Sequence, residues 1–493
     1  MALLPEVKRD YGRLKLLIGG AWVDTASSDV RETTNPATGA RIAEFPQATL
    51  EEGRAAAAAA AAAFRSWREV CVRDRARMLF DLRATIEQRF EELCRILTQD
   101  HGRTIKESRG SLRRVQENVE SACAAAYSLV KMNEHIDQLA PGIDQHLVWE
   151  PRGAFLIVTP GNIPMHAWSS FVPYALAAGC TVVVSPSPHD PVAAEAITRA
   201  AQEVFPPGTI NLIHGSPEIN QDLLRRPEIQ GIGFIGSSRV GRQLHQLCGE
   251  LGKPCSLNGN GKNHVVIMPD ADLDQVVPSL ISSCFGMSGQ RCLGSDNVVV
   301  VGDRAAALRD KLAAAAAKLK LGYGLDESTE LGPMCTPAGK DRVLDWIERA
   351  VNEGARIVLD GRNPKVAGHE SGYFLAPTVL ENGNPEMATA KEESFGPVAI
   401  LMRASSVDEA LEWINTKSGY GHSACIFTES GKIARKFTRE AEVGNVGVNM
   451  AIPQPYAFFP LGSKKASFLG QAKSRLASMR LFLDEKTVTS RWV

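Results

Sequence analysis

At Ile232-Gly233-Phe234-Ile235-Gly236-Ser237-Ser238 the chain passes from a short apolar run into a turn of small residues. Residues 239–251 follow with Val240, Leu244 and Leu247 at helical spacing. Short apolar runs are typical of buried strands, and a spacing of three or four residues places apolar side chains on one face of a helix. The stretch therefore predicts a strand, a tight turn and a helix in succession.

The same order of strand and helix recurs toward the N-terminus. Apolar runs stand at residues 154–158, 180–184 and 210–214, and helical patterns lie between them at residues 168–178 and 192–204. Strands that alternate with helices predict a parallel sheet of β-α-β units. The turn at Gly236 and Ser237 would expose free N–H groups at a helix N-terminus, which suit the pyrophosphate of a dinucleotide. The turn is not a G-x-G-x-x-G motif and such turns also simply connect elements, so alone it is a weak signal.

Three further regions complete the organisation. A second α/β region is expected from Gly261 to about Asn449, with strands at residues 264–268, 297–301 and 356–359 and helices at 305–320 and 340–353. Long helices are expected from Leu50 to Thr98 and over residues 110–131, because the nine alanines at 55–63 are the best helix formers. Residues 145–150 indicate an extended hairpin, residues 480–489 a final strand, and residues 452–468, which contain three prolines, a loop.

Composition limits the function classes. At 493 residues the chain should divide into two or three domains. Lys and Arg nearly balance Asp and Glu, and the formal net charge is -1. We therefore expect no overall electrostatic attraction to nucleic acid or to an anionic membrane. The ten cysteines are scattered without a C-x-x-C pair, which predicts neither a zinc site nor a disulfide framework and fits a reducing cytoplasm. No apolar stretch suits a signal peptide or a membrane span.

One cysteine stands in a setting that suits chemistry. Cys292 ends the glycine-flanked stretch Phe285-Gly286-Met287-Ser288-Gly289-Gln290-Arg291-Cys292. Most cysteines are small core residues, so a catalytic role for Cys292 has to be argued from its neighbouring residues. A thiolate is a strong nucleophile toward carbonyl carbon, and we expect the neighbouring Arg291 to favour the charged form. The sequence predicts that Cys292 is a nucleophile.

The pattern around Cys292 resembles the aldehyde dehydrogenase superfamily, most closely its CoA-acylating methylmalonate-semialdehyde dehydrogenase branch. The resemblance runs from about Leu17 to the C-terminus. Its motifs, in the family's order, are Thr159-Pro160-Gly161-Asn162-Ile163-Pro164, Phe234-Ile235-Gly236-Ser237, Gly261-Lys262-Asn263-His264, the Cys292 stretch, Glu393-Ser394-Phe395-Gly396-Pro397 and Lys486-Thr487-Val488-Thr489-Ser490-Arg491-Trp492. Any one of them alone would be weak, whereas the ordered set is specific.

The resemblance implies a fold with three parts. These are a doubly wound, Rossmann-like cofactor domain (residues 1–133 and 153–258), an α/β catalytic domain (259–450) and a small β oligomerisation arm (134–152 and 470–493). The arm implies a homodimer or homotetramer. The implied cofactor is NAD or NADP, and its contacts fall on Thr159, Pro160, Ser185, Gly236, Ser237, Glu393 and Phe395.

The resemblance also assigns the catalytic and substrate groups. The side chain of Asn162 and the backbone N–H of Cys292 would form an oxyanion hole. Arg114 and Arg291 fall where the branch binds a substrate carboxylate, for which a guanidinium fork is well suited. Without the resemblance, Asn162 would be an ordinary turn residue and Arg114 a solvated charge on a helix.

Asn258 separates two reaction types. Hydrolytic members of the superfamily carry a glutamate four residues before Lys262 that activates water, and this chain has Asn258 there. Asparagine cannot accept a proton, which favours transfer of the acyl group to CoA. The expected function is NAD(P)-dependent oxidation of a small aldehyde, such as malonate or methylmalonate semialdehyde, with CoA as acyl acceptor. The alternatives are a hydrolytic dehydrogenase, an acyl-CoA reductase, or a non-catalytic relative.

Two segments depart from the family pattern. Ser185-Pro186-Ser187-Pro188 stands where relatives carry a lysine and then a glutamate that contact the adenosine ribose. Loss of these bonds should weaken dinucleotide binding unless other residues compensate, and it leaves NAD versus NADP open. Phe459-Pro460-Leu461-Gly462-Ser463-Lys464-Lys465 replaces a Gly-Gly-Trp-Lys type sequence, so the acyl pocket is expected to differ.

Overall fold

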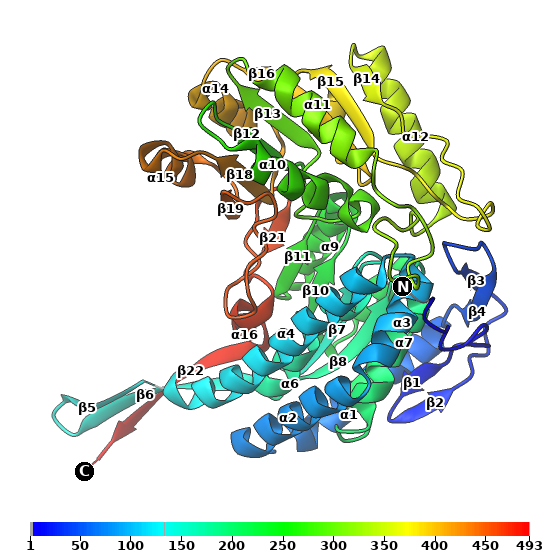
Figure 1. Ribbon diagram of the computed structural model, residues 1–493. Coiled ribbons are helices and arrows are strands. Elements are labelled where there is room, and N and C mark those ends of the chain that lie inside the picture. Colours follow the sequence, from blue (N-terminus) through cyan, green and yellow to red (C-terminus); the bar gives the residue numbers. More distant parts are fainter. Residues whose placement is uncertain (1–2, 133, 493) are drawn as a thin grey trace.

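An eight-stranded sheet organises the N-terminal half of the computed structural model, which describes residues 3–132 and 134–492 (Figure 1). Its strand order is β2-β1-β9-β8-β7-β10-β11-β21. The bounds are β1 Leu16–Ile18, β2 Ala21–Val23, β7 Ala154–Thr159, β8 Thr181–Pro186, β9 Ile210–Leu212, β10 Ile229–Ile235, β11 Cys255–Asn258 and β21 Phe468–Gly470. The five strands from β9 to β11 are parallel. The order reverses between β7 and β10, and such a point is where open α/β sheets bind ligands.

Helices cover this sheet. They are α1 (Leu50–Trp67), α2 (Val72–Gln88), α3 (Phe90–His101), α4 (Ile105–Met132), α7 (Pro191–Gln202), α8 (Pro217–Arg225) and α9 (Ser238–Leu251). In α1 the alanine run buries Ala56, Ala57 and Ala60 completely, so the small side chains let the helix lie close to the strands. A capping box between Thr49 and Glu52 fixes where α1 begins.

A seven-stranded sheet forms the upper half of the view, in the order β14-β15-β16-β13-β12-β18-β19 (Figure 1). Its strands are β12 His264–Ile267, β13 Asn297–Val301, β14 Arg356–Leu359, β15 Thr378–Gly383, β16 Val398–Ala404, β18 Ser423–Phe427 and β19 Asn445–Val448. Beside it lie α10 (Leu273–Leu280), α11 (Ala305–Ala316), α12 (Pro337–Asn352), α14 (Val407–Glu412) and α15 (Gly431–Glu440). Separate apolar clusters fill its two faces.

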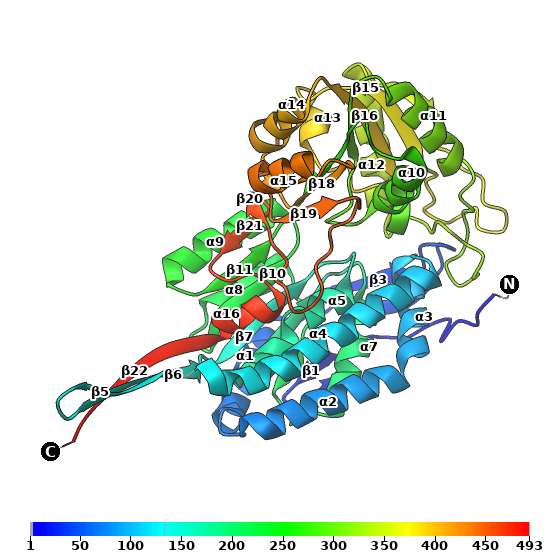
Figure 2. The ribbon, with the colours of Figure 1, turned by 60° about the vertical axis from the view of Figure 1, so that its left-hand side comes forward.

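A three-stranded ribbon projects from the body in both ribbon views (Figures 1 and 2). It contains β5 (His135–Ala140), β6 (Ile143–Pro151) and β22 (Leu483–Arg491) in the order β22-β6-β5, all antiparallel. The expected hairpin is thereby confirmed. Residues 1, 2, 133 and 493, which belong to the domain ranges expected from the resemblance, lie outside the described residues.

Three expectations for the elements need correction. The helix expected over 168–178 is two short helices, α5 (Pro164–Ser169) and α6 (Val172–Ala178), because Pro173 occupies the first turn of a new helix. The final strand begins at Leu483 and not at Arg480, since Met479–Phe482 form the helical turn α16. The 452–468 segment is loop except for β20 (Lys464–Lys465), which pairs with β17 (Tyr420–Gly421), and the first residue of β21.

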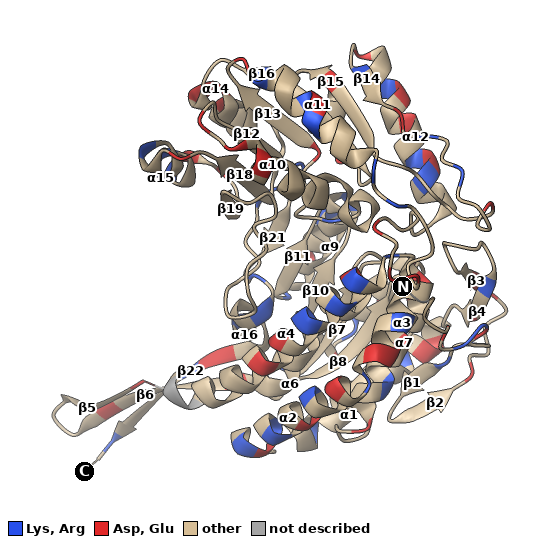
Figure 3. Ribbon diagram, in the orientation of Figure 1, with Lys and Arg blue, Asp and Glu red and all other residues tan. Residues whose placement is uncertain are grey.

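Charge is mixed over the surface. Lysines and arginines alternate with acidic residues on helices such as α2 and α12 (Figure 3). None of the described helices is both long and apolar enough to cross a membrane.

Candidate active site

Two pockets meet at Cys292. The α4 pocket, about 760 Å³, is bordered by α4 and by Arg114, Arg291 and Arg475. The α9 pocket, about 660 Å³, is bordered by the start of α9 and by Glu393. Cys292 and Asn162 line both, so one thiol faces both spaces.

The two sheets explain this position. Asn162 follows β7 and the Gly236 turn follows β10, so both lie at the carboxyl edge of the first sheet. Cys292 precedes β13 and Glu393 precedes β16, so both lie at the amino edge of the second sheet. The chain passes from one edge to the other between β11 and β12, and the site lies between the facing edges.

The turn that carries Cys292 depends on two glycines. Gly289 has φ +71°, and a Cβ there would lie 1.8 Å from the carbonyl oxygen of Gly396. A Cβ on Gly261 would lie 2.7 Å from the carbonyl oxygen of Cys292. Asn263 donates from Nδ2 to that same oxygen at 2.8 Å. Close backbone approach therefore fixes Cys292 against the residue 393–397 segment and the residue 261–263 crossing.

Burial governs the charge of the thiol. It raises the pKa of Cys292 to about 11, the negative charge of Glu393 adds to the rise, and Arg475 opposes it. The thiol is therefore neutral at pH 7 in this state. The cation that favours the thiolate is Arg475 and not, as expected from the sequence, the neighbouring Arg291. The guanidinium of Arg291 turns instead toward Glu107, at 3.5 Å.

Asn162 lies within reach of the nucleophile segment. Its Nδ2 donates to the carbonyl oxygen of Gln290 at 2.9 Å, two residues before Cys292. Arg103, almost fully buried, donates to the backbone carbonyl of Asn162. A side-chain amide has two N–H groups, so a second donor remains for an oxyanion after the Gln290 bond is made.

Glu393 is held by a residue that the sequence analysis missed. Its Oε1 accepts the backbone N–H of Gly261 at 3.1 Å, and its Oε2 accepts the side-chain N–H of Asn260. Burial raises the pKa of Glu393 to about 7, although these hydrogen bonds oppose the shift. Asn260 also accepts the backbone N–H of Ser238 at 2.7 Å. One side chain thus connects Glu393 to the first turn of α9.

The α9 pocket contains most of the residues assigned to a dinucleotide. Thr159, Pro160, Gly236, Ser237, Glu393 and Phe395 line it. Ser185 lies behind the wall at the end of β8, 1% exposed, and its Oγ has no partner among the described residues. At the start of α9, the N–H of Val240 is capped by Ser237 and that of Ser238 by Asn260, so fewer free N–H groups are present than the sequence suggested. Arg239 on the same turn brings a positive charge to the pocket.

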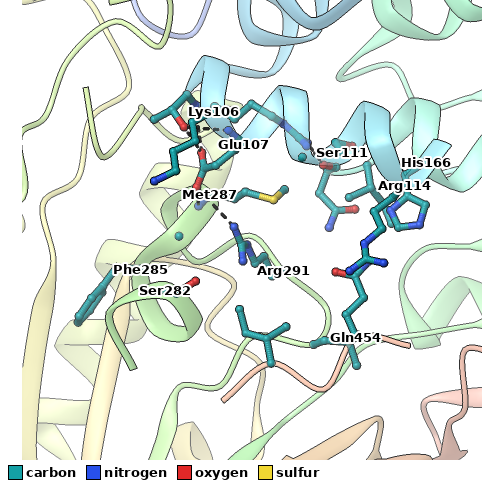
Figure 4. Close-up of a pocket in the computed structure, with 18 of the residues that line it drawn as sticks. Lys106, Glu107, Ser111, Arg114, His166, Ser282, Phe285, Met287, Arg291 and Gln454 are labelled. Atoms are coloured by element: carbon teal, nitrogen blue, oxygen red, sulfur yellow. Dashed lines mark hydrogen bonds and ion pairs between the residues drawn. The ribbon is translucent and has the colours of Figure 1, made fainter. Parts of the chain in front are cut away.

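The α4 pocket contains both arginines assigned to a substrate carboxylate, and their side chains lie on different sides of it (Figure 4). Arg114 on α4 pairs with Glu117 at 2.7 Å and lies 4.4 Å over the ring of Tyr456. Glu107, which pairs with Arg291, also accepts the backbone N–H of Met287 at 2.6 Å. Each arginine thus has one carboxylate neighbour and keeps further N–H donors.

Arg475 is a further arginine in this pocket, and the sequence analysis did not find it. It is 2% exposed and donates to the backbone oxygen of Pro455 at 2.5 Å. Its Nη2 lies 3.4 Å from His166 Nε2, which is the acceptor because burial and Arg475 hold the pKa of His166 well below its usual range. Burial lowers the pKa of Arg475 to about 10, so it is charged at pH 7. It lies beyond the altered segment at residues 459–465, and no sequence motif marked it.

Asn258 ends β11 and is 1% exposed. Neither its Oδ1 nor its Nδ2 has a hydrogen-bond partner among the described side chains and backbone groups. It lines neither pocket. The position that carries a base in hydrolytic relatives therefore offers no proton acceptor toward Cys292.

The pattern of the aldehyde dehydrogenase family matches residues 22–488, which contain the site. The chain belongs to the aldehyde dehydrogenase family. It is 37% identical to malonate-semialdehyde dehydrogenase 2 of Geobacillus kaustophilus over 97% of this chain and 99% of the relative. It is 36% identical to the mitochondrial methylmalonate-semialdehyde dehydrogenase [acylating] of Arabidopsis thaliana, over 97% of this chain and 79% of that one.

Solved structures agree with the family. A methylmalonate-semialdehyde dehydrogenase of Oceanimonas doudoroffii matches with a TM-score of 0.95 at 35% identity, over 98% of this chain and 99% of that chain. A structure from Sinorhizobium meliloti 1021, complexed with NAD, matches with a TM-score of 0.95 at 32% identity over 98% of both chains. The resemblance and the fold class predicted from the sequence are confirmed.

Replacing Cys292 by alanine should abolish aldehyde oxidation, because the proposed nucleophile would be missing. Cys284→Ala is the matched control, since Cys284 is buried in the π-helical turn Ile281–Phe285 and faces neither of the two large pockets. Initial rates of NAD(P)H formation measure both variants. Equal loss of activity in the two would contradict the assignment.

The raised pKa of Cys292 predicts a pH dependence for its alkylation. Because only the thiolate reacts, the rate with iodoacetamide should rise about tenfold for each pH unit up to about pH 10, whereas a free thiol with pKa about 8.5 levels off earlier. Mass spectrometry of the Cys292 peptide, with N-acetylcysteine as reference, measures the rate. A plateau below about pH 8 would show a thiolate already formed at rest.

Proposed function

We propose that this chain oxidises a small semialdehyde with NAD or NADP as hydride acceptor and passes the acyl group to CoA. One observation carries the proposal. Cys292 borders a pocket whose lining includes Arg114, Arg291 and Arg475, and the position of the hydrolytic base is the buried amide Asn258. Malonate-semialdehyde and methylmalonate-semialdehyde dehydrogenases among the relatives support this substrate class.

The first step is addition of Cys292 Sγ to the aldehyde carbon. Its thiol must lose a proton first, and the pKa of about 11 makes this step sensitive to any cation that enters the site. The C=O π pair moves to oxygen as the S–C bond forms. The free N–H of Asn162 Nδ2 and the backbone N–H of Cys292 would stabilise this oxyanion, and removal of one such donor costs about 100- to 1000-fold in rate.

The α9 pocket suits the dinucleotide. It lies beyond the carboxyl ends of β7 and β10, where the strand order reverses, and such crevices bind dinucleotides in doubly wound sheets. Glu393 would accept from a ribose hydroxyl, Arg239 would pair with phosphate, and Thr159 and Phe395 would contact the rest. When bound, the nicotinamide accepts the hydride that leaves the aldehyde carbon. The absence of charged groups at Ser185 and Pro188 predicts modest affinity, with Arg239 as partial compensation.

The thioester on Cys292 then needs an acceptor. Asn258 cannot deprotonate water, and the thiol of CoA is a far better nucleophile than unactivated water. Transfer to CoA forms one S–C bond, breaks the bond to Cys292 and returns its thiol. The same residues would also catalyse the reverse reaction, in which an acyl-CoA and reduced cofactor give the aldehyde.

The substrate carboxylate would lie in the α4 pocket. Arg114 and Arg291 each retain donors beyond their bonds to Glu117 and Glu107. Arg475 contributes a further positive charge with no carboxylate bonded to it among the described residues. An anionic substrate is therefore favoured over a neutral aldehyde of the same length.

A hydrolytic dehydrogenase is the second candidate, and Glu393 favours it. Its pKa of about 7 suits a general base, it borders the α9 pocket, and its charge affects Cys292. Both its oxygens already accept hydrogen bonds, which opposes this role. The product, free acid or thioester, distinguishes the two candidates.

The remaining parts of the proposal concern assembly and location. We propose that the unit on the eight-stranded sheet binds cofactor, that the unit on the seven-stranded sheet carries catalysis, and that the projecting ribbon joins copies of the chain. Exposed Ile136, Leu139 and Trp492 on the ribbon support the last point. A cytoplasmic location stays a prediction from the scattered cysteines.

With CoA omitted, one equivalent of reduced cofactor should form per active chain and turnover should then stop, because the thioester on Cys292 accumulates. Stopped-flow absorbance of NAD(P)H measures the burst, and intact mass measures the acylated chain. Addition of CoA should restore turnover. Sustained formation of free acid without CoA would contradict the proposal, and its loss in Glu393→Gln would then assign the base.

Arg114→Leu should lower kcat/KM for malonate semialdehyde by about 10- to 100-fold, because bonds to a charged group are worth about 1.5–3 kcal/mol. The effect on propanal should be small. Arg113→Leu is the matched control, since that neighbouring arginine pairs with Glu87 on the helix surface and does not line the α4 pocket. Equal losses on both substrates would indicate a structural role for Arg114.

A further inference from the structure

A buried group of side chains lies behind the active site. His101 at the end of α3, Asp190 before α7 and Cys335 before α12 bring their nitrogen, oxygen and sulfur atoms within 4.8 Å of one another. The thiol of Cys335 donates to Asp190 Oδ1 at 3.3 Å. The three come from distant segments, which is why spacing along the chain predicted no such cluster.

The polar atoms of this group lack partners. His101 and Asp190 are fully buried, at 0% exposure. Both ring nitrogens of His101 and Oδ2 of Asp190 have no hydrogen-bond partner among the described residues. Oδ1 of the adjacent Asp100, 1% exposed, also has none. A hydrogen-bonded structural cluster would use these atoms, since each unpaired buried polar group costs about 1–3 kcal/mol.

We propose that His101, Asp190 and Cys335 bind a divalent cation of the Zn²⁺ type. Imidazole nitrogen, carboxylate oxygen and thiolate sulfur are the donors that Zn²⁺ uses in tetrahedral sites. A fourth position remains for water or for Asp100. The thiol of Cys335 would release its proton to solvent on binding, because only the thiolate coordinates.

The charges around the group agree with a divalent ion. When deprotonated by a bound metal, Asp100, Asp190 and Cys335 would carry three negative charges beside the one positive charge of buried Arg103. A 2+ ion therefore makes the cluster neutral. Without an ion, protonation would have to remove the negative charge, and the buried atoms of His101, Asp190 and Asp100 named above would still lack hydrogen bonds.

The position gives the ion an entry path and a structural effect. Cys335 borders the α9 pocket, so a cation can reach it from there. His101 and Asp190 belong to helices of the first sheet, and Cys335 precedes α12 of the second sheet. Bound metal would therefore join the two halves behind Asn162, whose carbonyl accepts from Arg103. The inference does not depend on the proposed substrate.

A second possible cluster lies on the projecting ribbon and provides a control. His135, Asp137 and Asp144 are close together but exposed or half-buried. His135 pairs with Asp137 at 3.1 Å, and Asp144 accepts from Trp492 Nε1 at 2.6 Å. These groups already form an ion pair and a hydrogen bond, so their geometry does not indicate a metal site.

The test is zinc binding by the full chain. Protein stripped with a chelator and kept reduced is dialysed against Zn²⁺, and bound metal is measured by elemental analysis. We expect one tight Zn²⁺ per chain and a higher Tm. Cys335→Ala and His101→Gln should each weaken binding by more than about 100-fold, since loss of even an outer-shell partner costs about 10- to 100-fold. His135→Gln and Cys71→Ser should bind as the unmodified chain does.

A measurement on the unmodified chain avoids variants that fail to fold. X-ray absorption at the zinc edge should show one sulfur at about 2.3 Å with nitrogen and oxygen at about 2.0 Å. Three results would each overturn the proposal. The first is a zinc shell of nitrogen and oxygen alone, and the second is the absence of tight binding. The third is zinc binding that is lost in His135→Gln but kept in Cys335→Ala. Because the readout is metal content, its failure leaves the proposed oxidation of an aldehyde untouched, and the converse also holds.

Discussion

The hydrogen bonds of Asn263 are the constraint on which the site depends. Its Nδ2 donates to the carbonyl oxygens of Cys292 at 2.8 Å and Gly294 at 2.6 Å, and its Oδ1 accepts the N–H of Ser423 at 3.0 Å. The side chain is 2% exposed, so water does not compete for these bonds. Beside it, Lys262 forms a buried ion pair with Asp296 at 2.8 Å. The crossing from β11 to β12 therefore fixes the turn before β13, and with it the proposed nucleophile Cys292.

Sequence patterns predicted the parts of this arrangement that depend on local periodicity. Apolar runs located β7, β8, β12 and β13 to within about two residues, because buried parallel strands are continuous in composition, whereas β10 begins at Ile229, before the predicted start at Ile232. The family motifs located Cys292, Asn162 and Glu393. The break between α5 and α6 was missed although Pro173 marks it, since the apolar pattern continues through both helices.

Residues that act through tertiary contact could not be found in this way. Arg475 lies in a stretch without motif, with φ +65°, and reaches the α4 pocket only because β21 returns to pair with β11. Asn260 resembles a loop residue until its two bonds to Ser238 and Glu393 are seen. His101, Asp190 and Cys335 come together only when α3, α7 and the start of α12 pack. The pattern within one segment does not indicate which distant segments it will contact.

The electrostatics of the site indicate that the charge of a bound ligand controls the ionisation of Cys292 and Glu393. At rest, burial keeps Cys292 protonated and brings Glu393 close to half-protonated at pH 7. Both groups border the α9 pocket, so a bound ligand that carries positive charge there favours the thiolate and the carboxylate together. An anion in the α4 pocket acts on Cys292 in the opposite sense but is neutralised by Arg114, Arg291 and Arg475. In the proposed reaction, these three arginines would offset the charge of a substrate carboxylate bound near the thiol that has to ionise.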